Sequence, residues 1–336
     1  MASAERSAAL VSGPEQRLAL RPWAARKLDD LGELQYHTVL ASVGYEPRSS
    51  AIARMLPRPR VGVAVGFETH REHAYDDNAR WYDEAHYNVS DDWGEAFPPL
   101  VRRLLTEAAQ EPGRRVAVDI SSMERPRIAA VVHSLATLSR QADLEVDLLY
   151  APAQFRPPGD LPSGTLSLTC VSAFFIGRLQ SASELADPVA LVGLGYEPYK
   201  AAGALQSLEV DRAVALVPEG FDERFLPEVL EANKGLLAGP DPPDQLRYPV
   251  ADPAECVALL DGQIHALRAR GATPLLLPLG PKIFTANACL AAAMHHPHVA
   301  VWRASFLERE DAVPHHPDGN VCGVTFTRRP AEQWDE

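Results

Sequence analysis

The sequence predicts an α/β fold built from two similar halves. Two observations carry this prediction: an apolar run ending in Gly-Tyr-Glu-Pro occurs twice, at 38–47 and 189–198, and an Ala-rich helix pattern follows each copy. An apolar strand, a tight turn and a helix form the first unit of a doubly wound sheet. We therefore expect two tandem Rossmann-like halves, each with a mainly parallel sheet, related by internal duplication.

Four apolar runs of the first half have the length and composition of buried strands. They lie at 38–43, 61–67, 115–120 and 144–150. Helical spacing of apolar residues separates them at 49–55, 97–109 and 126–138, and Pro112-Gly113 follows the second of these predicted helices. The polar and aromatic stretch 68–93 fits a helix with long loops.

The second half repeats this order. Its predicted strands lie at 189–194, 213–217, 273–279 and 298–302, and its predicted helices begin near Tyr199 and span 225–237, 254–270 and 283–294, with a Pro-rich loop before 254. The two Gly-Tyr-Glu-Pro copies start 151 positions apart, and the loops at Ser122 and Pro281 lie 159 positions apart. These nearly equal spacings predict modules of nearly equal length.

Five segments follow from this repeat. They are an N-terminal extension (1–36), a first Rossmann-like domain (37–162), a linker (163–186), a second Rossmann-like domain (187–312) and a C-terminal tail (313–336). Loops at the carboxyl ends of parallel strands lie at one edge of a sheet. The loops of both halves are therefore expected to converge on one crevice that binds a ligand.

Composition narrows the classes of partner. The 336 residues carry a formal net charge of −13, so a long nucleic acid is a poor partner and any phosphate must meet a local cluster of donors. No apolar run approaches the roughly 20 residues of a membrane span, and the first seven residues lack the order of a secretion signal. We expect a soluble, cytoplasmic protein without membrane contact.

The cysteines and lysines are few. Without a C-x-x-C pair, the cysteines predict buried thiols, with no metal or other cofactor; they are Cys170, Cys256, Cys289 and Cys322. Of the four lysines, Lys200 follows Glu197 by three residues and Lys282 ends Gly280-Pro281-Lys282. A compact ammonium suits a phosphate oxygen, although coding bias alone also explains why arginine carries most positive charge.

The repeated turn supplies the first candidate ligand contacts. Gly44 and Gly195 allow the backbone to approach a ligand closely, and each following helix presents free N–H groups to an anion. Tyr45 and Tyr196 could stack on a base, while the adjacent Glu46 and Glu197 could accept hydrogen bonds from ribose or an exocyclic amine. The alternative is that these tyrosines and glutamates only brace the turn.

The loop from Asp119 to Arg125 is the richest in polar groups. A carboxylate, two hydroxyls and an arginine ahead of a helix are parts of a phosphate or ribose pocket, although a serine there can also be an ordinary N-cap. The G-x-S-x-G elbow of a nucleophilic serine is absent, and no residue is assigned a catalytic role. The predicted ligand-binding residues are Gly44, Tyr45, Glu46, Arg48, Asp119, Ser121, Ser122, Arg125, Gly195, Tyr196, Glu197, Lys200, Gly280, Pro281 and Lys282.

Other polar motifs favour structural roles. Arg127 and His133 have an Arg-x₅-His spacing inside an apolar helix pattern, which indicates core packing, and His295-His296-Pro297-His298 reads as a loop. The segment 68–93 is the better candidate for metal or acid–base chemistry, but its aromatic residues favour a lid or a partner surface. Its candidate ligands are His70, His73, Asp76, Asp77, His86, Asp91 and Asp92.

Two stretches carry a resemblance to a known family. Val118-Asp119-Ile120-Ser121-Ser122-Met123 and Leu279-Gly280-Pro281-Lys282 stand where that family commonly has an aspartate or asparagine followed by Thr-Gly-Gly-Thr-Lys. With this order of strands, loops and helices, 37–152 and 187–305 resemble CRISPR-associated Rossmann-fold (CARF) sensors of antiviral systems. The resemblance implies that a nucleotide second messenger binds between two such domains, here fused in one chain.

Three functions remain open. The first is a nucleotide-sensing protein of a defence or stress system that signals to a separate effector protein, with a homodimer possible. The second is an enzyme acting on a nucleotide or nucleoside, with Glu46, Asp119 or Glu197 as acid–base group and Lys282 or Arg125 holding phosphate. The third is a non-catalytic scaffold. Near-symmetric loops favour sensing, because catalysis usually requires unequal roles at the two positions.

Overall fold

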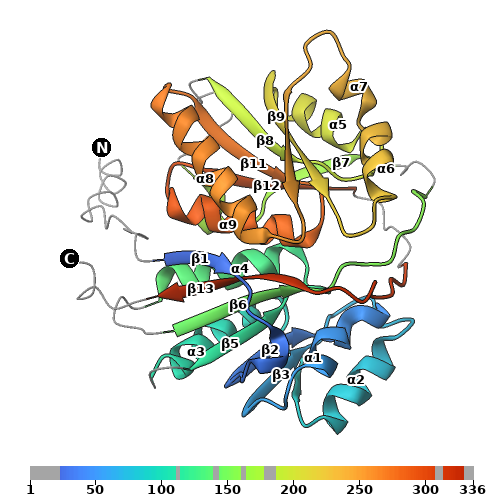
Figure 1. Ribbon diagram of the computed structural model, residues 1–336, viewed down its shortest axis with the longest axis vertical. Helices are drawn as coiled ribbons and strands as arrows, with labels where there is room; N and C mark the ends of the chain where they lie inside the picture. The colour runs from blue at the N-terminus through green and yellow to red at the C-terminus, as the bar shows by residue number, and fades with distance from the viewer. Residues whose placement is uncertain are drawn as a thin grey trace, which may run out of the picture.

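Two mixed sheets with helices on their faces form the molecule (Figure 1). The computed structural model describes residues 23–110, 114–138, 144–159, 164–177, 187–306 and 313–328. Each sheet is mostly parallel, which confirms the predicted α/β class and its two-half architecture.

The first sheet has seven strands in the order β1-β13-β6-β5-β2-β3-β4, and the strands from β6 to β4 are parallel. Its strands are β1 (Trp23–Lys27), β2 (Thr38–Ser42), β3 (Val61–Val65), β4 (Asn88–Ser90), β5 (Arg115–Asp119), β6 (Leu144–Tyr150) and β13 (Cys322–Arg328). The helices of this half are α1 (Ala51–Met55), α2 (Tyr75–Glu84), α3 (Phe97–Ala108) and α4 (Arg125–Thr137). Short 3₁₀ turns occupy Leu31–Glu33, Pro47–Ser50 and Gly94–Ala96.

The second sheet has six strands in the order β10-β9-β8-β11-β12-β7, parallel from β10 to β12. Its strands are β7 (Leu166–Cys170), β8 (Pro188–Gly193), β9 (Arg212–Glu219), β10 (Asp244–Pro249), β11 (Thr273–Pro278) and β12 (Ala300–Phe306). The helices are α5 (Lys200–Ser207), α6 (Phe225–Ala232), α7 (Lys234–Leu237), α8 (Pro253–Ala269) and α9 (Lys282–Met294), with a 3₁₀ turn at Ala173–Ile176.

The strands predicted from long apolar runs are all present, and the strands that the sequence does not predict lie at or next to sheet edges. β4 lies in the polar stretch 68–93, and β10 lies in the predicted Pro-rich loop. The predicted extension, linker and tail contain the strands β1, β7 and β13, which the sequence does not predict, while the five segment bounds stay a prediction. Edge strands bury less of their surface, and their polar composition therefore resembles that of loops.

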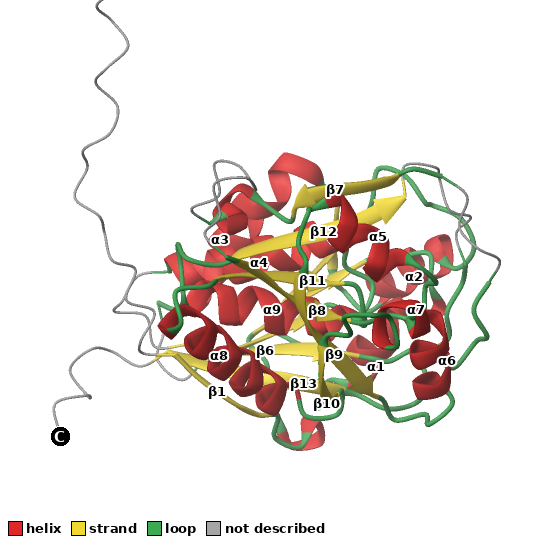
Figure 2. Cartoon of the chain, turned by 90° about the horizontal axis from the view of Figure 1, so that it is seen from above, coloured by secondary structure: helices red, strands yellow, loops and turns green. Residues whose placement is uncertain are grey.

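The two halves exchange their last strands. β6 and β7 begin at residues 144 and 166, and β12 and β13 begin at 300 and 322, so each last strand follows 22 residues after the one before it. Yet β7 pairs antiparallel with β12 of the second half, and β13 pairs antiparallel with β6 of the first (Figures 1 and 2). The two crossing connections touch where Ala153 bridges Pro317.

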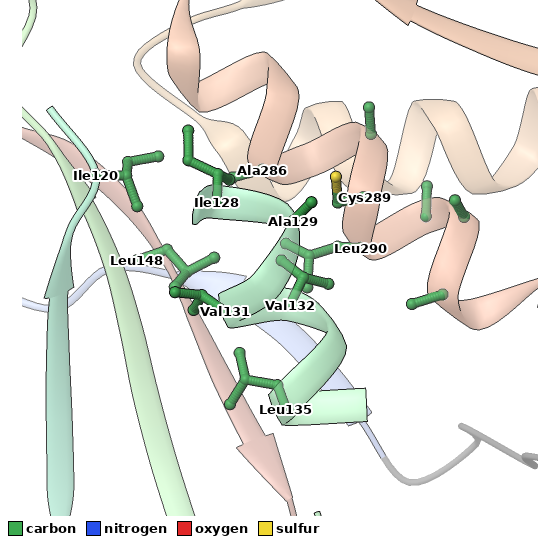
Figure 3. Packing of buried hydrophobic residues seen from close by; sticks show 14 of the residues in the cluster. Ile120, Ile128, Ala129, Val131, Val132, Leu135, Leu148, Ala286, Cys289 and Leu290 are labelled. Carbon is green, nitrogen blue, oxygen red and sulfur yellow. The ribbon is translucent and has the colours of Figure 1, made fainter. Parts of the chain in front are cut away.

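A single apolar core joins the halves. Ile128, Val131 and Val132 of α4 pack between the first sheet and α9, which contributes Ala286, Cys289 and Leu290 (Figure 3). Every residue of α9 from 283 to 293 is buried, as expected for a helix that is apolar on all sides and covered by both halves. Smaller cores lie on the outer faces, under α1 and α2 in one half and under α5 and α6 in the other.

Strand exchange and a common core predict cooperative unfolding. Neither half can lose its structure without removing a strand from the other sheet, so we expect one calorimetric transition with equal calorimetric and van't Hoff enthalpies. Differential scanning calorimetry of the whole chain measures both values. Two resolved transitions would contradict the prediction and would favour independent domains at 37–162 and 187–312.

Candidate functional site

The loop after β2 is fixed by hydrogen bonds from two helices. Ser49 accepts a hydrogen bond from the Gly44 amide at 2.7 Å and donates to the Ser42 carbonyl at 2.5 Å. The Asn78 side chain of α2 donates to the carbonyls of Gly44 and Glu46, both at 2.9 Å. In the second half, Asn233 donates to the Gly195 carbonyl at 2.7 Å. The duplication thus extends to an asparagine clamp that the sequence analysis does not predict.

The glycines of the second half are needed for packing between loops. A Cβ atom on Gly195 would lie 2.6 Å from the Leu279 carbonyl oxygen, and one on Gly280 would lie 2.5 Å from the Leu194 carbonyl oxygen. Both distances are too short for real carbon–oxygen contacts. At Gly195, where close approach of a ligand is predicted, the space is taken by the backbone of Leu279, and Gly280 packs in the same way against Leu194.

Glu46 is a buried carboxylate with several partners. Arg48 donates to it at 2.8 Å and 3.2 Å, His315 lies 3.1 Å away, and the Ser122 hydroxyl lies 3.4 Å away. Burial acts to raise the pKa of Glu46, but Lys282, His315 and Arg48 together lower it well below its usual range. Glu46 is thus anionic at neutral pH. The Arg48 guanidinium is itself buried and also donates to the Ala151 carbonyl at 3.2 Å, which gives it a bracing role.

Asp119 and Ser121 also brace the loop. Both are buried; the Ser121 amide donates to Asp119 at 2.9 Å, and the Ala151 amide donates to the Ser121 hydroxyl at 2.9 Å. Burial raises the pKa of Asp119 to about 6, and its hydrogen bonds from Ser121 limit the rise. Neither side chain lines the cavity described below.

Two cations cross between the halves. Arg125 and Lys282 are the first residues of α4 and α9, two helices of 13 residues each. Arg125 donates to the carbonyls of Pro278 at 3.0 Å and Gly280 at 3.2 Å, and Lys282 donates to the Ser121 carbonyl at 2.9 Å. Each half therefore supplies a cation that caps the polar loop of the other half.

These loops surround a cavity of about 320 Å³. Six predicted site residues line it: Gly44, Tyr45, Glu46, Ser122, Arg125 and Lys282. His70, which the sequence offers as a metal or acid–base candidate, also lines the cavity. The other lining residues are not among the predicted site residues: Phe67, Met123, Glu124, Pro126, Arg303, Ala304 and Ser305. The remaining predicted residues lie outside this lining: Arg48, Asp119, Ser121, Gly195, Tyr196, Glu197, Lys200, Gly280 and Pro281.

The cavity combines positive charge with aromatic surface. Lys282, Arg125 and Arg303 line it together with the N-terminal ends of α4 and α9, whose backbone dipoles favour an anion. Burial lowers the pKa of the Lys282 ammonium to about 8, while Glu46 opposes that shift. The Tyr45 ring lies 5.8 Å from the ring of His70. His70 and His73 have φ values of 60° and 52°, an uncommon conformation for residues other than glycine.

The equivalent loop of the second half has different neighbours. Tyr196 packs against Phe225 with 5.8 Å between ring centroids. Glu197 pairs with the buried Lys200 at 2.6 Å, and the Lys200 ammonium lies over the Phe306 ring at 5.5 Å. Tyr196 and Glu197 therefore contact neighbouring side chains and do not line the cavity. This agrees with the alternative in which these residues only brace the turn.

The Arg-x₅-His pair has a structural role. Arg127 is buried, donates to the Gly66 carbonyl at 2.5 Å, and lies 3.9 Å over the Phe67 ring. His133 stacks on Phe174 at 4.2 Å, and His296 stacks on the same ring at 4.4 Å. The core interpretation of Arg127 is therefore confirmed.

In the described parts of the chain, no cluster of three or more His, Cys, Asp or Glu side chains has a geometry that could hold a metal ion, and the four cysteines are unpaired thiols. No described helix combines the length and apolar character needed to cross a membrane.

The fold and the site define an α/β protein with two Rossmann-like halves and a polar cavity at their junction. No protein-family model matches the chain, and no curated protein matches it. Among solved structures, the chain is similar to a type III CRISPR defence DNA nuclease activated by cyclic oligoadenylate, with 10% identity and a TM-score of 0.42. The match covers 77% of this chain, and the chain spans 64% of the length of that structure.

Proposed function

We propose that the protein binds a small nucleotide-type ligand in the cavity between its halves. The observation that carries this proposal is the convergence of Lys282, Arg125 and two helix N-termini on one cavity. Because the chain as a whole carries a net charge of −13, an anion is favoured where such donors are gathered locally rather than over the general surface. Ser122 and Ser305 add hydroxyl donors that suit phosphate oxygens.

The aromatic lining supports a nucleotide over a simple anion. Tyr45 and His70 offer ring surfaces on which a base can stack, and Glu46 offers a carboxylate that can accept from ribose or an amine. We further propose that the protein acts as a sensor in a prokaryotic defence or stress system, and that a separate effector protein recognises its ligand-bound state. A homodimer is compatible with this arrangement.

Binding is tested by titrating the whole protein with a panel of nucleotides, using calorimetry and thermal shift, followed by chromatography of the ligand. We expect saturable binding and recovery of intact ligand. Lys282→Gln removes the ammonium, and a hydrogen bond to a charged group contributes about 1.5–3 kcal/mol, so we expect roughly 10- to 150-fold weaker binding. Conversion of a bound nucleotide to product would instead support the enzyme alternative.

Two further variants accompany this experiment, one as a control and one as a second test. Lys27→Gln removes an exposed lysine on the edge strand β1 and should leave the affinity unchanged. Arg303→Gln removes a second cavity cation that is not tied to the loop of the other half, and it should weaken binding even if Lys282→Gln unfolds the chain. A panel without any binding nucleotide, or equal affinities in all variants, would contradict the proposal.

The affinity is expected to fall above pH 8. Burial holds the pKa of Lys282 at about 8, below its ordinary 10.5, with Arg48 and Arg125 lowering it and Glu46 and Glu124 raising it. An anionic ligand favours the charged ammonium, so affinity falls by about twofold from pH 7 to 8 and then by up to roughly tenfold per pH unit. Calorimetric titrations at pH 7.0 to 9.5 measure this profile, and Lys282→Gln should flatten it.

A further inference from the structure

The cavity is asymmetric although the fold is duplicated. Tyr45 of the first half lines it, whereas the equivalent Tyr196 packs against Phe225 outside it. Likewise Glu46 lies at the cavity, whereas the equivalent Glu197 pairs with Lys200. The second half contributes instead Lys282 and a part of β12, residues 303–305.

This asymmetry affects which ligand fits. A ligand with two-fold symmetry places identical bases and phosphates against both halves, and it binds best where both halves offer the same groups. Here one side offers Tyr45 and His70, and the other offers Arg303 and Ser305. A base and a phosphate at opposite ends of one molecule match such a lining better than two copies of each.

The size of the cavity points the same way. Ligand cavities span roughly 300–1,000 Å³, and this one, at about 320 Å³, lies at the lower end of that range. One nucleotide unit has one base, one sugar and its phosphates. A cyclic oligonucleotide has several such units and needs several times the space of one.

We infer that the ligand is a single nucleotide unit, with its base against Tyr45 and His70 and its phosphate at the cavity cations Arg125, Lys282 and Arg303. This inference rests on the proposed function and narrows it to linear mononucleotides. It differs from a second messenger held between two equivalent domains, which the CARF resemblance implies. In this arrangement the phosphate of the ligand meets the cations at the N-termini of α4 and α9. The base meets the aromatic side chains, which only the first half supplies.

The duplicated tyrosines supply a matched pair of variants. The whole protein is titrated calorimetrically with the four common nucleoside monophosphates, their triphosphates, and cyclic tetra-adenylate. Tyr45→Ala and Tyr196→Ala are then compared for the tightest ligand, with ligand-free melting temperatures measured for both. Stacking of a base on an aromatic ring contributes roughly 5- to 150-fold in affinity, so Tyr45→Ala should weaken binding by an amount in that range.

The expected results are one linear nucleotide per chain, an affinity of Tyr196→Ala within twofold of the parent, and recovery of most of the affinity in Tyr45→Phe. If Tyr45→Ala does not fold, the affinity of His70→Ala tests the proposed base contacts instead. Tight binding of cyclic tetra-adenylate that both tyrosine variants weaken equally would overturn the inference while leaving the proposed function intact. Binding of no nucleotide at all would overturn both.

Discussion

Replacing Asp147 with alanine is expected to lower the free energy of unfolding by about 3–5 kcal/mol. Asp147 on β6 is fully buried and accepts hydrogen bonds from Arg115 at 2.6 Å and 3.0 Å and from the Tyr36 hydroxyl at 2.7 Å. Removing the carboxylate leaves the Arg115 guanidinium, which is only 10% exposed, without its buried counter-charge. Chemical denaturation in urea, followed by circular dichroism, measures the loss.

Asp29→Ala provides the matched control. Asp29 contacts the same arginine at 3.1 Å, but its side chain is 47% exposed, so water can replace it. The control should leave stability nearly unchanged, since exposed ion pairs contribute little. If Asp147→Ala cost no more than Asp29→Ala, the buried pair would not be a main support of the first sheet.

The Asp147 network also supports the exchanged strand. Arg115 of β5 donates to the Thr325 hydroxyl of β13 at 3.3 Å, and Thr325 is paired in register with Asp147 itself. Loss of the network therefore weakens the attachment of β13 as well as the first half. Because β13 belongs in chain order to the second half, we expect the variant to unfold in one transition at lower urea rather than in two.

The fold could be predicted wherever a strand is buried on both faces. Runs such as 38–43 and 189–194 consist almost entirely of apolar residues, because central strands of a parallel sheet have helices on both sides. The exchange of β7 and β13 could not be predicted in the same way. A strand has the same local pattern whichever sheet it joins, and only the contacts made across the molecule decide between β6 and β12.

The candidate site was predictable only in part. The loop glycines, Tyr45, Ser122, Arg125 and Lys282 stand directly after apolar strands, so the topology rule brings them to the junction. Arg303 and Ser305 carry no such signal, because they lie within a strand rather than in a loop that follows one. Their strand, β12, pairs with β11 at two positions and with β7 at five. Asn78 and Asn233 occupy roughly equivalent positions in the two halves, and this repetition could have marked them as structural residues. It becomes visible only after the two halves are aligned.

Replacing Arg48 with methionine is expected to cost about 3–5 kcal/mol of stability at pH 7, because it breaks a second buried ion pair. The side chains of Arg48 and Glu46 are 6% and 8% exposed, so little water can reach either charge. Methionine keeps much of the apolar packing but leaves Glu46 with only the His315 ring and the Lys282 ammonium as neighbours of this kind. Denaturation in urea measures the cost, and Arg212→Met, which removes an exposed partner of Asp187, should show no measurable change.

The cost of Arg48→Met should fall as the pH is lowered. In the parent protein burial favours the neutral acid, but the surrounding cations hold the pKa of Glu46 below its ordinary value of 4.5. The ionised carboxylate therefore contributes stability that is present above pH 4.5 and lost at lower pH. Without Arg48 the pKa of Glu46 rises, so the variant already protonates Glu46 in mildly acid solution and loses less on further acidification. Urea midpoints of both proteins from pH 7 to pH 3 should converge; parallel curves would show that Arg48 acts through packing and its bond to Ala151 rather than through the charge of Glu46.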